Sequence, residues 1–109
     1  MARFILLYRG PATPMENITA AESEQIRQAW GAWMGKLGAA IVDGGAPFAG
    51  RTALLGDGST GAATDLNGYT VVEAADLEEA TSLCAAHPFL SDGTRKFAVE
   101  IYELAPMEM

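Results

Sequence analysis

The longest regular pattern of apolar positions lies between Thr19 and Asp43 and has the period of an α-helix. The apolar residues recur at the i, i+3, i+4, i+7 spacing that places them on one helical face. They are Ile26, Ala29, Trp30, Trp33, Met34 and Leu37. Thr19 and Glu22 form a capping-box pattern at the start, and Gly38 is placed to end the helix in a left-handed conformation. We therefore predict a helix that ends at Gly38 and runs into a short buried strand, residues 39–43.

Other apolar stretches predict strands. Residues 3–8 are apolar on both faces, which is typical of a central strand with both faces covered. Further strands are predicted at 51–55, 68–74 and 96–104. The alternation in the last strand separates two sets of residues, Phe97, Val99 and Ile101 on one face and Glu100 and Tyr102 on the other. Residues 56–67 are rich in Gly, Ser, Thr and Asp and are predicted to be an exposed loop.

A second, shorter helix is predicted after Asp76, which forms another capping-box pattern with Glu79. Its predicted inner stripe consists of Leu77, Ala80, Leu83 and Cys84. Pro88 cannot continue this helix and disfavours helical geometry at His87, so the helix is expected to end there. A turn at 91–94 then leads to the last strand.

The predicted order is strand, helix, strand with a hairpin, strand, helix, strand. Two βαβ halves on an antiparallel sheet indicate a ferredoxin-like α+β fold. At 109 residues the chain is expected to be one domain, residues 1–109. Since one layer of helices covers only one face of a sheet, the apolar side chains on the other face predict a homodimer in which two sheets pack face to face.

Composition narrows the possible functions. Half of the residues are hydrophobic, which argues against disorder, and the net charge of -7 disfavours nucleic acids and anionic membranes as partners. The longest apolar run, residues 4–8, is too short to span a bilayer, and the N-terminus lacks the pattern of a signal peptide. A single cysteine, Cys84, fits a reducing compartment, so we expect a cytoplasmic protein.

The predicted topology places several polar side chains at one edge of the sheet. The first strand ends there with Tyr8 and Arg9, the second strand ends with Asp43, and the second helix ends at His87. His87 is the single histidine and is the candidate proton carrier, since its reference pKa is near neutrality. Asp43 would orient the imidazole, and Arg9 would hold an anionic or enolate-like oxygen of a substrate. Tyr8 is placed to contact that substrate.

The first helix starts from the same edge, which makes Arg27 and Trp30 further candidates for substrate binding. Each assignment has a structural alternative. His87 before proline is equally typical of a turn residue at a helix end, and Asp43 before two glycines of a turn former. Arg9 can be solvated at a strand end, and Trp30 can belong to the core.

Motifs for cofactors are missing from the sequence. One histidine and one cysteine leave too few soft ligands for a closed zinc site. Neither a phosphate-binding loop nor a dinucleotide fingerprint is present, and there is no nucleophile elbow. We therefore predict that the protein uses no cofactor or metal. Cys84, on the inner stripe of the second helix, is interpreted as a buried apolar filler.

Six segments together resemble the YCII-related (DGPF-type) proteins over nearly the whole chain. They are FILLY at 4–8, AWGAWMGKLG at 29–38, IVDGG at 41–45, GYTVVEA at 68–74, DLEEA at 76–80 and His87-Pro88. The resemblance implies a dimeric α+β barrel, and a His–Asp pair is the proposed active site of such proteins. Some relatives are linked to haloaromatic breakdown and others to sigma factors. This chain departs from the pattern, because its first helix has no histidine, Trp30 stands near that place, and the DGPF tetrad is absent.

These observations lead to one main hypothesis and two alternatives. The main hypothesis is a cofactor-free acid/base enzyme of lyase or isomerase type that acts on a small aromatic or enolisable molecule. The first alternative is a non-catalytic module for sensing a small ligand or binding a protein. The second, by fold analogy alone, is a cofactor-free monooxygenase.

Overall fold

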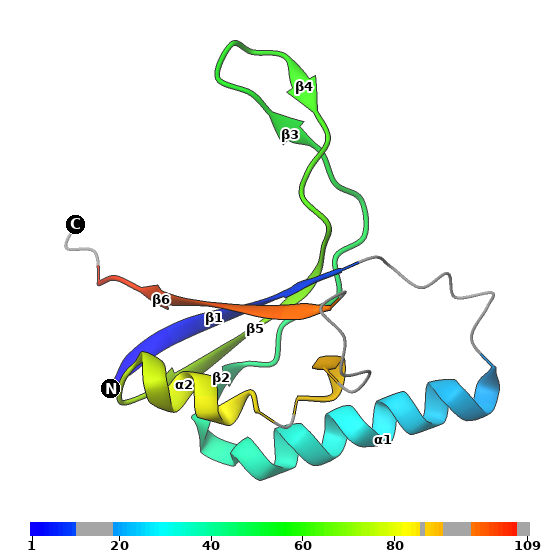
Figure 1. Cartoon of the computed structure of the whole chain (residues 1–109), viewed down its shortest axis with the longest axis vertical. Helices are drawn as coiled ribbons and strands as arrows, with labels where there is room; N and C mark the ends of the chain where they lie inside the picture. Colours follow the sequence, from blue (N-terminus) through cyan, green and yellow to red (C-terminus); the bar gives the residue numbers. More distant parts are fainter. Residues whose placement is uncertain (11–18, 86, 91–96, 107–109) are drawn as a thin grey trace.

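The computed structural model describes residues 1–10, 19–85, 87–90 and 97–106 (Figure 1). The elements, in chain order, are β1 (Ala2–Arg9), α1 (Ala20–Leu37), η2 (Gly38–Ala40), β2 (Ile41–Asp43), β3 (Ala53–Leu54), β4 (Thr60–Gly61), β5 (Leu66–Ala74), α2 (Leu77–Leu83), η3 (Pro88–Leu90) and β6 (Ala98–Leu104). Among these residues, four strands form an antiparallel sheet in the order β2-β5-β1-β6. Both α-helices lie against the same face of this sheet (Figure 1). This arrangement confirms the predicted ferredoxin-like α+β fold.

Strand β1 lies inside the sheet, between β5 and β6, as its two apolar faces predicted. Phe4, Leu6 and Tyr8 face the helices and are buried, while Ile5 and Leu7 lie on the opposite face. The described helices leave that opposite face uncovered (Figure 1). In the following text it is called the uncovered face.

The ends of α1 follow the local signals in the sequence. The Thr19 hydroxyl oxygen accepts a hydrogen bond from the backbone N–H of Glu22 at 3.1 Å. At the other end Gly38 has a φ of 55°, a conformation that favours glycine, and its N–H donates to the Met34 carbonyl. The predicted cap at Thr19 is therefore confirmed, and Gly38 ends the helix with the expected positive φ, although its ψ of -120° differs from the predicted left-handed helical conformation.

The apolar face of α1 is buried only in its second half. Trp33 is buried, and Trp30, Met34 and Leu37 pack against the core. Ile26 is 49% exposed, because the N-terminal half of the helix extends beyond the end of β1 (Figure 1). Of the apolar residues on this face, Ile26 therefore does not belong to the buried core.

Helix α2 is capped as predicted, since a carboxylate oxygen of Asp76 accepts the N–H of Glu79 at 2.8 Å. Ala80 and Cys84 are buried in the core, which agrees with the interpretation of Cys84 as an apolar filler. Leu77 is 50% exposed and does not belong to the inner stripe, contrary to the prediction.

The segment after β2 differs most from the prediction. Residues 56–67 are not a simple loop, because β4 pairs with β3 in a hairpin and β5 already begins at Leu66. Asp57 closes the hairpin turn by accepting hydrogen bonds from the N–H and hydroxyl of Ser59 at 2.9 and 2.6 Å. The hairpin projects from the sheet on the side away from the helices (Figure 1).

In β6 the predicted alternation is confirmed. Ile101 pairs with Leu6 and packs against the core together with Val99, while Glu100 and Tyr102 lie on the uncovered face. The predicted turn at 91–94 and the predicted strand start at Lys96 lie outside the described residues. No helix in the described part of the chain is both long and apolar enough to cross a bilayer.

Candidate functional site

His87 is the centre of a buried aromatic cluster between the sheet and α1. The residue follows α2 directly before η3 and is 2% exposed. Its ring centroid lies 4.1 Å from that of Trp33, 4.6 Å from that of Trp30 and 4.8 Å from that of Tyr8. Helix α2 has already ended at Leu83, and Pro88 begins η3 directly after His87.

Hydrogen bonds connect His87 to the sheet. Nε2 of His87 lies 3.1 Å from Oη of Tyr8, and that oxygen lies 2.5 Å from Oγ1 of Thr70. The Thr70 hydroxyl donates to the carbonyl of Gly44 at 3.3 Å. On the other side of the ring, the backbone N–H of Phe89 donates to Nδ1 at 3.0 Å. A continuous polar chain therefore crosses the core from η3 to the loop after β2.

Burial sets the protonation of this chain. It lowers the pKa of His87 to about 4, because the imidazolium form would lose its hydration. Burial also raises the pKa of Tyr8 to about 12, against a smaller opposing effect of its hydrogen bond to Thr70. Near pH 7 both side chains are therefore neutral.

A cleft of about 720 Å³ adjoins the Tyr8 and Thr70 end of this series of hydrogen bonds. Its described wall is mainly apolar, with Trp30, Met34, Phe48, Phe89 and Phe97 among the lining residues. Tyr8 and Thr70 also line it and bring the polar chain to its wall. Among the described lining residues none has a charged side chain. A cleft of this size and character suits a small, largely apolar molecule.

The loop at 44–48 forms one side of this cleft and is held close to β5. Gly45 has a φ of 75°, and a Cβ atom at this position would lie 1.6 Å from the carbonyl oxygen of Tyr69. Phe48 donates its N–H to the carbonyl of Asn67 at 2.8 Å. Glycine is therefore required at residue 45 by both conformation and space.

Asp43 does not contact His87, contrary to the predicted pairing. One carboxylate oxygen of Asp43 accepts the N–H of Gly45 at 2.9 Å, and the other accepts the hydroxyl of Tyr69 at 3.2 Å. This second hydrogen bond raises the pKa of Tyr69. Since both ring nitrogens of His87 bond to Phe89 and Tyr8, Asp43 has the role of a turn former here.

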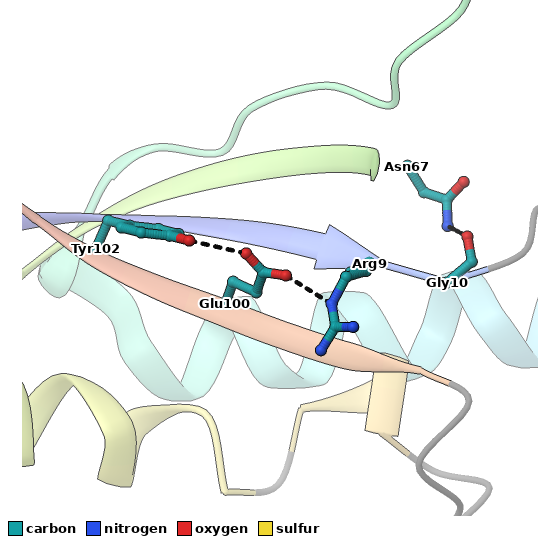
Figure 2. A network of polar contacts seen from close by, with 5 residues as sticks. All are labelled: Arg9, Gly10, Asn67, Glu100 and Tyr102. Atoms are coloured by element: carbon teal, nitrogen blue, oxygen red, sulfur yellow. Dashed lines mark hydrogen bonds and ion pairs between the residues drawn. The ribbon is translucent and has the colours of Figure 1, made fainter. Parts of the chain in front are cut away.

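Arg9 also lies apart from the imidazole. Its Nε atom lies 2.5 Å from Oε2 of Glu100, whose other oxygen accepts the hydroxyl of Tyr102 at 3.0 Å (Figure 2). These three residues lie on the uncovered face, because successive residues of a strand point to opposite faces and Tyr8 points to the helices. At the same end of the sheet, Asn67 donates to the carbonyl of Gly10 at 2.9 Å (Figure 2).

Of the predicted substrate-binding residues, Tyr8 and Trp30 line the cleft. Arg27 instead pairs with Glu24 on the exposed surface of α1. Thr70 was not predicted from the sequence, although a polar residue at an inward position of β5 was a usable signal. The hydrogen bond from the backbone N–H of Phe89 to His87 could not be predicted in this way, because every residue except proline has a backbone N–H.

In the described part of the chain, no three His, Cys, Asp or Glu side chains lie together in a way that could hold a metal ion.

Comparison with known proteins agrees with this architecture. A structure with the same fold is that of 5-chloro-2-hydroxyhydroquinone dehydrochlorinase from Burkholderia phenoliruptrix in complex with 2,5-dihydroxybenzoquinone. It is 19% identical, with a TM-score of 0.59 over 94% of this chain and 93% of that chain. A search of curated proteins gave no match. The model of the YCII-related domain matches residues 1–108, so this chain belongs to the YCII-related family.

Proposed function

We propose that this protein is a cofactor-free enzyme of lyase or isomerase type that acts on a small aromatic or enolisable molecule. The observation that carries the proposal is a hydrogen-bonded chain that starts at the buried His87 and reaches the wall of the cleft at Tyr8 and Thr70. A hydroxyl that is hydrogen-bonded to an imidazole can interact with an oxygen substituent on which charge develops during acid/base chemistry.

The cleft favours planar ligands. The ring centroids of Trp30 and Phe89 lie 5.2 and 5.3 Å from that of Tyr8, which leaves aromatic surfaces at the wall. Because the described lining residues carry no charged side chain, a neutral compound or an anion with delocalised charge fits better than a compact anion.

The dehydrochlorinase with the same fold supplies matching probes. Its structure holds 2,5-dihydroxybenzoquinone, a planar ring with oxygen substituents. The similarity extends to the fold alone, so the compound serves here as a test molecule. We expect it to bind in the cleft of this protein with quenching of tryptophan fluorescence, since Trp30 lines the cleft.

The decisive experiment combines binding with turnover. We expect wild-type protein to bind 2,5-dihydroxybenzoquinone and to convert compounds of the 5-chloro-2-hydroxyhydroquinone type, measured as chloride release or absorbance change. Tyr8→Phe should lose turnover, whereas the matched variant Tyr102→Phe, on the uncovered face, should keep it. If the wild-type protein converts none of these compounds, the proposal is contradicted.

A second candidate is a ligand-sensing module without catalysis. In its favour, every buried side-chain nitrogen and oxygen atom among the described residues already has a hydrogen-bond partner. A site in which all buried polar atoms are hydrogen-bonded is rigid and can serve as a binding pocket without catalysing a reaction. This function predicts saturable binding of the probe without conversion across a broad set of substituted phenols and quinones.

We also propose that the protein acts as a homodimer formed by two uncovered faces. Ile5, Leu7 and Val71 lie on this face only partly exposed, and Tyr102 and Leu104 are 52% and 43% exposed there. The hairpin of β3 and β4 projects on the same side and lengthens the available surface (Figure 1). Packing this face against a second copy would remove its apolar side chains from water.

A further inference from the structure

The hydrogen bond from Phe89 fixes which nitrogen of His87 carries the proton. A backbone N–H can only donate, so Nδ1, which lies 3.0 Å from it, must present a lone pair. In a neutral imidazole the proton is then on Nε2. Nε2 lies 3.1 Å from Oη of Tyr8 and therefore donates to that oxygen.

The remaining hydrogen bonds have a fixed direction as well. Since the Thr70 hydroxyl donates to the Gly44 carbonyl at 3.3 Å, its oxygen is left to accept. The proton between Tyr8 and Thr70, across 2.5 Å, is therefore the Tyr8 hydroxyl proton. Each donor in the chain points the same way, from His87 through Tyr8 and Thr70 to the backbone.

This order makes His87 a poor proton carrier. A second proton on the ring would have to displace the Phe89 N–H from Nδ1 and leave that buried donor without a partner. The surrounding rings of Trp30 and Trp33 offer no polar group that replaces water. The lowered pKa of His87, about 4, agrees with the geometry.

We infer that Tyr8 is the residue that donates a hydrogen bond to an oxygen of the bound molecule, and that His87 is a neutral positioning residue acting through Tyr8. This inference rests on the proposed function for the existence of a ligand. When the ligand binds, the Tyr8 O–H turns from Thr70 to the ligand oxygen, and no covalent bond changes in this step. The N–H donated by His87 polarises the Tyr8 hydroxyl and strengthens its hydrogen bond to the ligand.

The substrate class follows from this donor. The substrate oxygen that accepts this hydrogen bond must be a good acceptor and must gain negative charge during the reaction. A quinone carbonyl or an enolate next to a planar ring meets both conditions. The high pKa of Tyr8, about 12, keeps the hydroxyl protonated and able to donate.

The first test needs no ligand. His87 is the single histidine, so a sample labelled with ¹⁵N-histidine gives one pair of ring resonances. At pH 7 we expect a protonated Nε2 and an unprotonated Nδ1. A proton on Nδ1, or a cationic ring, would overturn the inference.

The second test compares three variants with 2,5-dihydroxybenzoquinone as the probe. His87→Gln keeps an N–H donor directed at Tyr8 without a titratable ring, whereas the shorter His87→Asn does not reach. We expect Tyr8→Phe and His87→Asn to weaken binding or kcat/KM about tenfold or more, and His87→Gln to recover most of the loss. If His87→Gln is as inactive as His87→Asn in folded protein, His87 carries the proton and the inference fails.

The outcomes separate the inference from the proposed function. If the wild-type protein neither binds nor converts the probes, the proposed function fails, and the ¹⁵N measurement still decides the direction of the hydrogen bonds. If it binds and converts them while Tyr8→Phe retains full activity, the inference alone is overturned.

Discussion

Trp33 lies with its ring centroid 4.1 Å from that of His87 and donates its Nε1–H to the carbonyl of Leu83 at 3.0 Å. One indole thus contacts the imidazole and binds the end of α2 to α1. Because this packing encloses His87, the ring has little access to the water that would stabilise its cationic form.

The stability of the protein should therefore depend on His87 at acidic pH. The pKa of His87 is about 4 in the folded protein against the ordinary histidine value of 6.5, so the unfolded chain takes up the proton first as the pH falls. We expect the free energy of unfolding to fall between pH 6.5 and pH 4, by roughly 3 kcal/mol from this group. Urea titrations at several pH values would measure it.

The control for this prediction is His87→Gln, which removes the titrating ring. Carboxylates affect the stability of both proteins in the same pH range, so the difference between the two curves isolates the histidine. Identical pH dependence in the two proteins would contradict a buried neutral imidazole.

The loop beside the cleft should be intolerant of a side chain at residue 45. In Gly45→Ala the added Cβ would lie 1.6 Å from the Tyr69 carbonyl oxygen at a φ of 75°. We expect a loss of about 2 kcal/mol or more in unfolding free energy. Gly31→Ala, in the exposed interior of α1 with nothing within 4 Å, should instead stabilise by about 1 kcal/mol. Thermal unfolding of both variants tests the pair.

Dimer formation should be sensitive to charge on the uncovered face. Leu7→Asp places a carboxylate within the proposed contact between sheets and should give a monomer by light scattering after size exclusion. Leu77→Asp makes the same chemical change at the exposed start of α2 and should leave the assembly unchanged. If both proteins, or neither, dissociate, this face is not the interface.

Removal of Arg9 should leave ligand binding intact. Its ion pair with Glu100 is on the face opposite Tyr8, and its side chain is 51% exposed, so Arg9→Ala should cost no more than about 1 kcal/mol in stability. Arg27→Ala, on the surface of α1, is the matched control. If Arg9→Ala binds 2,5-dihydroxybenzoquinone more weakly while Arg27→Ala does not, and the oligomeric state is unchanged, then Arg9 binds an oxygen of the ligand after all.

Features set by local interactions could be predicted from the sequence. Thr19 and Asp76 cap the two helices through contacts within three residues of each, and Gly38 takes the expected positive φ. The topology also followed, since two βαβ units with a central apolar strand leave few alternatives. Strand β3 lies within the predicted strand at 51–55, but its partner β4 was missed, because the Gly-rich composition of that segment is equally typical of a loop.

The candidate site could be predicted only in part. Topology brought Tyr8 and His87 to one end of the sheet, but it could not show which face each neighbouring side chain takes. Arg9 follows Tyr8 directly and therefore points away from it. Asp43 bonds to its own turn, a local contact that competes with any long-range partner. The contact between Tyr8 and Thr70 joins positions 62 residues apart and has no local signature.

The central place of β1 has a consequence for synthesis of the protein. Arg3 pairs with Glu73 on one side and with Leu104 on the other, so β1 gains its second neighbour only after β6, which follows it far along the chain, has been synthesised. Until then the nascent chain presents an apolar strand with open edges, the form most prone to aggregation. Folding is therefore expected to be a late, cooperative event, and slow because its contacts are so distant in the chain.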